Sequence, residues 1–148
     1  MRKLVAFGLL MLSSAAGAAA PGPGILADRF ISAWNRHDLK AFEALYTADA
    51  VWVPIAEERT EGRSAIVAEF AKIHAGTGWA MKTTIAKKDV PEVHFVTPDV
   101  ANIFFHMDFI KDGIPVPGFQ RAMIFVVVRQ SGDWKIAAGQ LTKESPPG

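Results

Sequence analysis

The spacing of hydrophobic residues predicts helices in the first half of the chain. Leu26, Phe30 and Trp34 recur at every fourth position, so one side of a helix over residues 25–36 is expected to be buried. Asp38 follows directly and suits the N-cap position of a second, shorter helix, because its carboxylate can accept from a free backbone N–H. The chain therefore begins its folded part with two consecutive helices.

A third helix is predicted to begin near Gly62 and to end before Gly76. Beyond Trp79 the hydrophobic residues recur at every second position, which is typical of β-strands. The predicted strands cover residues 51–55, 81–90, 93–96, 100–111, 119–129 and 134–142. This order predicts an α+β fold, with three N-terminal helices packed on one face of a curved antiparallel sheet.

The first twenty residues have the pattern of a secretory signal peptide. Arg2 and Lys3 are basic, residues 4–12 are continuously apolar, and residues 13–20 are almost all small. The apolar run is too short to span a membrane, and without cysteine the chain can carry neither a lipid-anchored cysteine nor a disulfide. We therefore expect one domain over residues 21–148, soluble and without a membrane anchor, in the periplasm or outside the cell.

Charge restricts the class of partner. The chain has 16 basic and 15 acidic residues, and without Arg2 and Lys3 it has 14 basic residues and a formal net charge of −1. A nearly neutral surface without basic runs argues against nucleic acid or an anionic membrane as the partner. The expected partners are a small molecule and, for the reason given next, a second copy of the chain.

Two predicted hairpins sort the strand residues into faces. If the turn at residues 112–117 is symmetric, Asp108 lies opposite Arg121, and a symmetric turn at residues 130–133 puts Met123 opposite Gln140. One face then collects Phe104, His106, Asp108, Arg121, Met123, Phe125, Trp134, Ile136, Gln140 and Thr142. The other collects Ile103, Phe105, Met107, Phe109, Ala122, Ile124, Val126 and Leu141.

The first of these faces predicts a pocket with an apolar floor and a polar mouth. The second face is almost wholly apolar. A sheet that is largely apolar on both faces must bury each face against another part of the protein or another subunit. The helices can cover one face. A second subunit is expected to cover the other, which predicts a homodimer.

Five segments carry a resemblance to a known superfamily: residues 34–38 (WNRHD), 48–51 (ADAV), 62–66 (GRSAI), 93–101 (VHFVTPDVA) and 132–138 (GDWKIAA). In their order and spacing they resemble the SnoaL-like members of the nuclear transport factor 2-like superfamily, notably the SgcJ/EcaC-type branch. The resemblance implies a cone-shaped α+β roll, usually dimeric, with one pocket between the helices and the concave sheet. The superfamily includes isomerases, cyclases, dehydratases and hydrolases as well as proteins that only bind ligands, so the fold does not decide the function.

The resemblance also implies which chemistry to exclude. Ketosteroid isomerases of this superfamily use a tyrosine and two acids, and the matching positions here look like Phe30, residues 53–54 and Met123, none of which is polar and ionisable. That particular isomerase chemistry is not expected. Four histidines without metal-ligand spacing, no cysteine and no nucleotide-binding motif predict neither a metal nor a cofactor.

Two functions remain open. In the first, the pocket binds a small apolar or weakly acidic molecule without catalysis. Its candidate ligand-binding residues are Trp34, Trp52, Phe104, Arg121, Met123, Gln140 and Thr142. In the second, the protein is a cofactor-independent isomerase, lyase or hydrolase in which His106 is the general base and Asp108 and Arg121 orient it. A simple ion pair between Asp108 and Arg121 is the structural alternative for those two residues.

Overall fold

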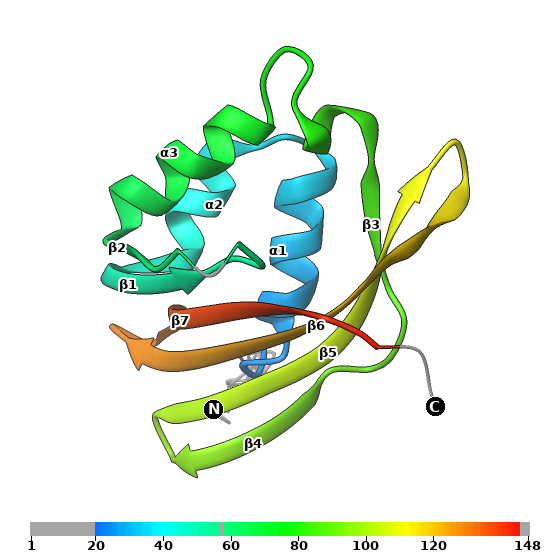
Figure 1. The fold of residues 1–148 in the computed structure, drawn as a ribbon. Helices are drawn as coiled ribbons and strands as arrows, with labels where there is room; N and C mark the ends of the chain where they lie inside the picture. Colours follow the sequence, from blue (N-terminus) through cyan, green and yellow to red (C-terminus); the bar gives the residue numbers. More distant parts are fainter. Residues whose placement is uncertain (1–19, 57, 146–148) are drawn as a thin grey trace, which may run out of the picture.

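The computed structural model describes residues 20–56 and 58–145, and in it the helices form a layer above a curved sheet (Figure 1). The helices are α1 (Ile25–Asn35), α2 (Leu39–Leu45), α3 (Arg63–Ile73) and the short 3-10 helix η1 (Trp79–Lys82). The strands are β1 (Tyr46–Val53), β2 (Thr60–Glu61), β3 (Thr84–Lys87), β4 (Glu92–Thr97), β5 (Val100–Lys111), β6 (Ile114–Gln130) and β7 (Asp133–Lys143). No helix in the described part of the chain is long and apolar enough to cross a membrane.

The α+β class with three helices on a curved sheet is confirmed, with one correction to the sheet. The strand order is β2-β1-β7-β6-β5-β3, and β4 also pairs with β5. All pairs are antiparallel except β1 with β7, which is parallel, so the sheet is mixed. The strand predicted from residue 51 also begins earlier, at Tyr46. The predicted signal peptide lies almost entirely outside the described residues.

The helices form where the hydrophobic spacing places them. On α1 the buried residues are Leu26, Ala27, Phe30, Ala33 and Trp34. The carboxylate of Asp38 caps α2 by accepting from the N–H of Ala41 at 3.0 Å, as its position in the sequence predicts. The side-chain amide of Asn35, at the end of α1, bonds both backbone groups of Ile85 (2.8 and 2.9 Å) and so fixes α1 over β3.

The register predicted for both hairpins is wrong. The turns themselves are tight two-residue turns with positive φ at Asp112 (52°), Gly113 (78°), Ser131 (51°) and Gly132 (81°), a pattern that matches the twist of a hairpin. Each hairpin then contains an irregularity, between the pairs of Asp108 and Ile110 in one and between those of Val126 and Val127 in the other. The first irregularity has three more residues in β6 than in β5, and the second has one more residue in β7 than in β6. An odd number of extra residues in one strand moves the following side chains to the opposite face.

The sheet therefore has two faces that differ from the predicted ones. The inner face, which the helices cover, presents Ala101, Ile103, Phe105, Met107, Phe109, Arg121, Met123, Phe125, Val127, Trp134, Ile136, Gly139 and Leu141. The outer face presents Asn102, Phe104, His106, Asp108, Ala122, Ile124, Val126, Ala138, Gln140 and Thr142. These two names are used below in this sense.

Candidate functional site

The predicted site residues are divided between the two faces. Trp34 on α1, Trp52 on β1, and Arg121 and Met123 on β6 lie on the inner side and are buried. Phe104, His106, Asp108, Gln140 and Thr142 lie on the outer face. The prediction that all nine line one pocket is wrong, because the irregularities in the hairpins separate residues that an undistorted ladder would bring together.

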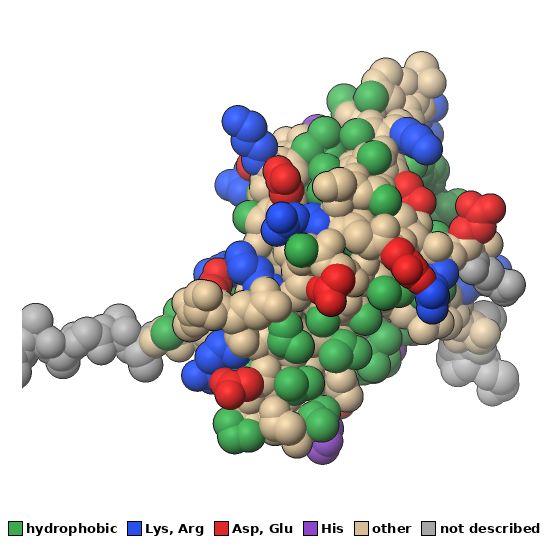
Figure 2. All heavy atoms as spheres, turned by 90° about the vertical axis from the view of Figure 1, so that its left-hand side faces the viewer, with side chains coloured by type: hydrophobic (Ala, Val, Ile, Leu, Met, Phe, Trp, Pro, Cys, Tyr) green, Lys and Arg blue, Asp and Glu red, His purple; other side chains and the backbone are tan. Residues whose placement is uncertain are grey.

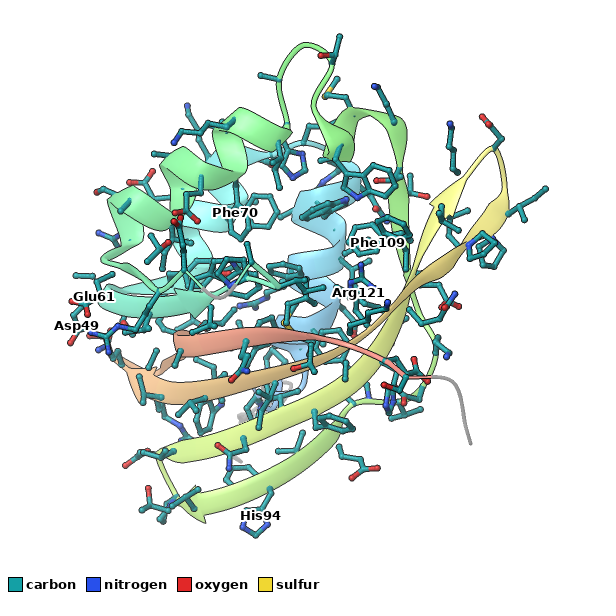
Figure 3. The ribbon with its side chains drawn as sticks, viewed as in Figure 1. Asp49, Glu61, Phe70, His94, Phe109 and Arg121 are labelled. Carbon is teal, nitrogen blue, oxygen red and sulfur yellow. The ribbon has the colours of Figure 1, made fainter. Side chains whose placement is uncertain are left out.

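Arg121 is the main polar group of the inner face. Its side chain points from β6 into the layer between sheet and helices, close to Phe109 (Figure 3). The residue is 8% exposed, and its Nη1 donates to the backbone oxygens of Gly118 (3.1 Å) and Gln120 (2.8 Å). Asp108 pairs with Gln120 across the ladder and faces outward, so the ion pair between Asp108 and Arg121, the structural alternative for these residues, is absent.

A buried guanidinium without a carboxylate is an unusual arrangement. Among the described residues no carboxylate lies within ion-pair distance of Arg121, and its Nε is buried without a hydrogen-bond partner. Burial lowers the pKa of Arg121, although a guanidinium stays charged at neutral pH in either case. The site therefore holds a positive charge and leaves at least one hydrogen-bond donor unused.

Aromatic rings surround this charge. The guanidinium carbon lies 5.0 Å from the ring centre of Phe119 and 5.9 Å from that of Phe109, within range for cation–π attraction. Trp79, from η1, stacks on Phe119 with 4.8 Å between ring centres. Trp79 and Phe119 are half-buried, so the cluster reaches the surface of the molecule.

Trp34 contacts the same cluster from the helix side. Its ring centre lies 5.5 Å from that of Phe109, and its indole Nε1 is buried without a partner among the described residues. The indole N–H of Trp34 is thus a second unused donor beside Phe109. The arrangement combines an anion-binding group, an indole donor and flat apolar surfaces, which suits an organic acid with an aromatic or apolar body.

His74, at the end of α3, makes a second polar contact in the inner layer. Its Nδ1 lies 2.9 Å from the Nδ1 of His37, and one ring must donate the shared hydrogen to the other. Burial, and then the neighbouring His37, lower the pKa of His74 to about 4. The pair joins the α1–α2 connection to α3.

His106 makes a different contact from the predicted one. Its Nδ1 and its backbone N–H both bond the carboxylate of Asp89, at 2.6 and 2.9 Å, and its ring packs against Phe104 on the outer face. The hydrogen bond to His106 lowers the pKa of the Asp89 carboxyl group against the opposing effect of its desolvation. Because this imidazole faces away from Arg121 and the helices, its predicted place as a base in that pocket is wrong.

We call Arg121 and the three aromatic residues beside it, Phe109, Phe119 and Trp79, the inner cluster. These three aromatic residues were not identified from the sequence as part of the site. Phe119 stands two positions before Arg121 in a strand, so alternation alone puts the two on one face. Phe109 was assigned to the opposite face because of the register error, and Trp79 lies in a connection without periodicity. Within residues 20–56 and 58–145, no three histidine or acidic side chains come together as a metal site.

The fold is that of several solved structures. A domain of unknown function with a cystatin-like fold from Nostoc punctiforme matches with a TM-score of 0.73 and 19% identity, covering 82% of this chain and 75% of its own. An uncharacterised protein with a cystatin-like fold from Caulobacter vibrioides gives 0.71 and 19%, with 82% and 87% covered. A ketosteroid isomerase-like protein from Erwinia carotovora atroseptica gives 0.64 and 20%, with 84% and 95% covered.

These similarities define the class of protein as an α+β fold shared by cystatin-like, ketosteroid isomerase-like and nuclear transport factor 2-like proteins. A family model described as a SnoaL-like domain matches residues 27–136, which is most of the chain, and no curated protein matches. The chain therefore belongs to the SnoaL-like domain family. The SgcJ/EcaC branch suggested by the sequence motifs is not confirmed.

Proposed function

We propose that this protein binds a small organic acid with an aromatic or apolar body between the helices and the inner face, and that Arg121 holds the acid group. The observation that carries the proposal is the buried guanidinium of Arg121, which has no carboxylate partner among the described residues. Fold relatives include ketosteroid isomerase-like proteins as well as proteins of unknown function, so either binding or isomerase-type chemistry is compatible with the fold.

Binding is the better supported of these two functions. A proton-transfer enzyme needs an acid or base whose pKa is near neutrality in contact with the substrate. The predicted base, His106, lies on the outer face, and the pKa of His74 is too low for it to take up a proton at neutral pH. The inner cluster offers donors and aromatic surfaces, which hold a ligand but do not move its protons.

An organic acid would supply what the cluster lacks. Its carboxylate can accept two hydrogen bonds from the planar fork of Arg121 and compensate the buried charge. Its apolar body can stack against Phe119 and Trp79, whose exposed edges the ligand would remove from water. A neutral amide of the same shape lacks the countercharge and should bind more weakly.

The test is a thermal-shift and calorimetry series with phenylacetate, indole-3-acetate and their neutral amides. The acids should stabilise the wild-type protein, and Arg121→Gln should weaken their binding at least about tenfold, which corresponds to about 1.4 kcal/mol. Arg129→Gln is the matched control, because Arg129 is exposed and pairs with Asp99. Equal binding of acid and amide, or binding that Arg121→Gln leaves unchanged, would contradict the proposal.

We further infer that a second copy of the chain covers the outer face. Phe104, Ile124 and Val126 are 36%, 39% and 36% exposed there, and no helix of the described chain covers them (Figure 1). A shallow hollow of about 130 Å³ between β1, β6 and β7 adds Val51, Val53 and Ala138 to this apolar area. The neighbouring Asn102, Gln140 and Thr142 are polar but uncharged, so a copy related by a two-fold axis that contacts these three residues brings no like charge against them.

Hydrophobic side chains are also exposed at the lower end of the molecule, where β4, β5 and β6 lie (Figure 2). Val96 on β4 is 59% exposed, and apolar area of this kind extends the proposed contact beyond the centre of the sheet. We also propose that the protein is exported, which the basic, apolar and small-residue order of residues 1–20 supports. Mass spectrometry of the protein from a periplasmic fraction tests the export and gives the cleavage site.

A further inference from the structure

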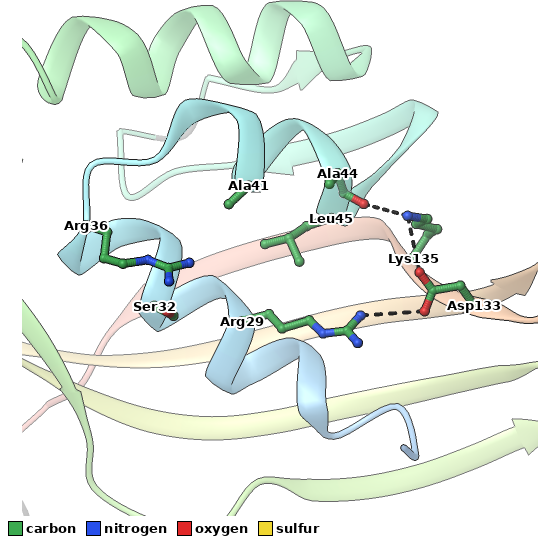
Figure 4. Close-up of a pocket in the computed structure, with 8 residues that line it drawn as sticks. All are labelled: Arg29, Ser32, Arg36, Ala41, Ala44, Leu45, Asp133 and Lys135. Atoms are coloured by element: carbon green, nitrogen blue, oxygen red, sulfur yellow. Dashed lines mark hydrogen bonds and ion pairs between the residues drawn. The ribbon is translucent and has the colours of Figure 1, made fainter. Parts of the chain in front are cut away.

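A hollow on the helical side of the molecule, away from Arg121, gathers positive charge. It has a volume of about 300 Å³ and lies between α1, α2 and the start of β7 (Figure 4). Its lining residues are Arg29, Ser32, Arg36, Ala41, Ala44, Leu45, Asp133 and Lys135. Three of these are basic and one is acidic, although the chain without its two leader cations has more acidic than basic residues.

The interactions inside the hollow leave part of this charge uncompensated. Asp133 is shared by Arg29 and Lys135, with both nitrogen–oxygen distances at 3.5 Å. Lys135 also donates to the backbone oxygen of Ala44 at 2.6 Å, which holds its ammonium group against the end of α2. Both cations compete for one carboxylate, so the three residues together keep one positive charge.

Arg36 adds a second positive charge. It stands at the end of α1, is exposed, and forms no ion pair with any residue that the structure describes. Arg29 and Arg36 are seven residues apart on one side of the helix, with Ser32 between them (Figure 4). Because α1 and α2 are fixed by packing, both arginines and the serine hydroxyl border the same hollow.

The walls of the hollow have a second, apolar component. Ala41 and Leu45 line it from α2, and Leu45 is only 5% exposed. A volume of about 300 Å³ lies at the lower end of the range for small-molecule sites. The hollow therefore combines a net charge of +2 with a short apolar wall.

We propose that this hollow binds a small phosphate monoester. A phosphate monoester carries a charge between about −1.5 and −2 at neutral pH and so matches the net charge of the hollow better than a carboxylate does. Arginine forks suit phosphate oxygens, and the apolar wall of Ala41 and Leu45 receives the ester group. This site is separate from Arg121 and does not depend on the function proposed for the inner cluster.

The experiment uses phenyl phosphate as the probe and follows backbone amide chemical shifts by NMR. Saturable shifts are expected for residues of α1, α2 and the start of β7, and benzoate should bind this hollow at least about fivefold more weakly. Arg36→Gln should weaken phenyl phosphate binding at least about fivefold. Lys111→Gln, which removes the same charge from the exposed β5–β6 hairpin, should leave it unchanged.

Three outcomes would overturn the proposal. The first is the absence of saturable shifts in these elements. The second is an equal effect of Arg36→Gln and Lys111→Gln, which would indicate general electrostatic attraction only. The third is shifts confined to the residues around Arg121 and abolished by Arg121→Gln, which would assign the probe to the inner cluster. Because Arg121→Gln leaves the helical hollow intact, failure at one site is distinguishable from failure at the other.

Discussion

Residues that are adjacent in the sequence alternate between the inner and outer faces of the sheet, and the two faces differ in how far their side chains are buried. On β5, Phe105 faces inward and is fully buried, while Phe104 faces outward and is 36% exposed. The inner face is packed by aromatic rings from three helices and the sheet, and its charged residue Arg121 is enclosed. The outer face mixes apolar and polar side chains, among them His106 and Asp108, and no helix of the described chain covers it. The difference shows that burial here follows from the position of the helices, not from the hydrophobicity of the strand residues.

The largest expected effect is the difference between these two phenylalanines. Phe105→Ala should destabilise the protein by about 3–5 kcal/mol, because it removes a fully buried ring and leaves a cavity. Phe104→Ala, at low protein concentration, should cost about 1 kcal/mol or less. Urea unfolding of both variants measures this. If both substitutions lowered the free energy of unfolding by similar amounts, the assignment of inner and outer faces would be wrong.

The pH dependence of the free energy of unfolding tests whether His74 is buried in the inner layer. The pKa of His74 is lowered to about 4 in the folded protein, and in the unfolded chain it is about 6.5. The unfolded state thus binds more protons between these values, so this contribution to stability is fully present above about pH 6.5 and is lost as the pH falls towards 4.

Urea unfolding at a series of pH values between 7 and 4 measures how the free energy of unfolding changes with pH. His74→Gln should remove most of the change in the free energy of unfolding with pH. His94→Gln should leave this pH dependence as in the wild type, because His94 is exposed and points away from the helices (Figure 3). The depressed pKa values of Asp89 and Asp133 act below this range, since their ordinary values are near 4. An unchanged pH dependence in His74→Gln would contradict the assignment.

A third comparison uses two adjacent positions of β7. A Cβ on Gly139 would lie 2.9 Å from Cε3 and Cζ3 of Trp52, a buried ring that has no room to move. Gly139→Ala should therefore cost about 1–3 kcal/mol. Ala138→Val, which adds atoms to the hollow of the outer face, should change stability by less than about 0.5 kcal/mol. Thermal and urea unfolding test both, and a neutral Gly139→Ala would argue against close packing at this point.

The last comparison concerns the proposed dimer. Ile124→Lys puts a charge into the apolar outer face and should raise the dimer dissociation constant at least about tenfold, or about 1.4 kcal/mol. Ile114→Lys is the matched control on the same strand, because Ile114 is 68% exposed and lies outside that apolar area. Sedimentation velocity over a concentration series measures both. A wild-type protein that stays monomeric at micromolar concentration would contradict the proposal.

Local signals in the sequence were sufficient for the helices and for the fold class. The stripe of Leu26, Phe30 and Trp34 and the cap of Asp38 act within a few residues, so their effect can be judged without knowing the rest of the fold. The two-residue turns at Asp112 and Ser131 also lie where turn residues occur. The family resemblance agreed with these signals, and membership of the SnoaL-like family followed.

The candidate site was predictable only in part. Trp34, Trp52, Arg121 and Met123 are buried on the side of the helices. The predicted places of Phe104, His106, Asp108, Gln140 and Thr142 were wrong, because each depended on counting residues through a hairpin that contains an irregularity. An odd number of extra residues in one strand moves every later side chain to the opposite face, and the composition of the strands does not predict it.

By itself, the sequence determined that the chain forms an α+β domain of three helices and a sheet, with Arg121 as a candidate ligand-binding residue. Only the tertiary structure decided which strand residues share a face, that Arg121 is buried among Phe109, Phe119 and Trp79 without a carboxylate, and that three cations meet between α1, α2 and β7. The physical reason is the range of the interactions. Helix stripes, caps and turns are local, whereas register, burial of a charge and the meeting of distant cations depend on how far-apart segments pack together.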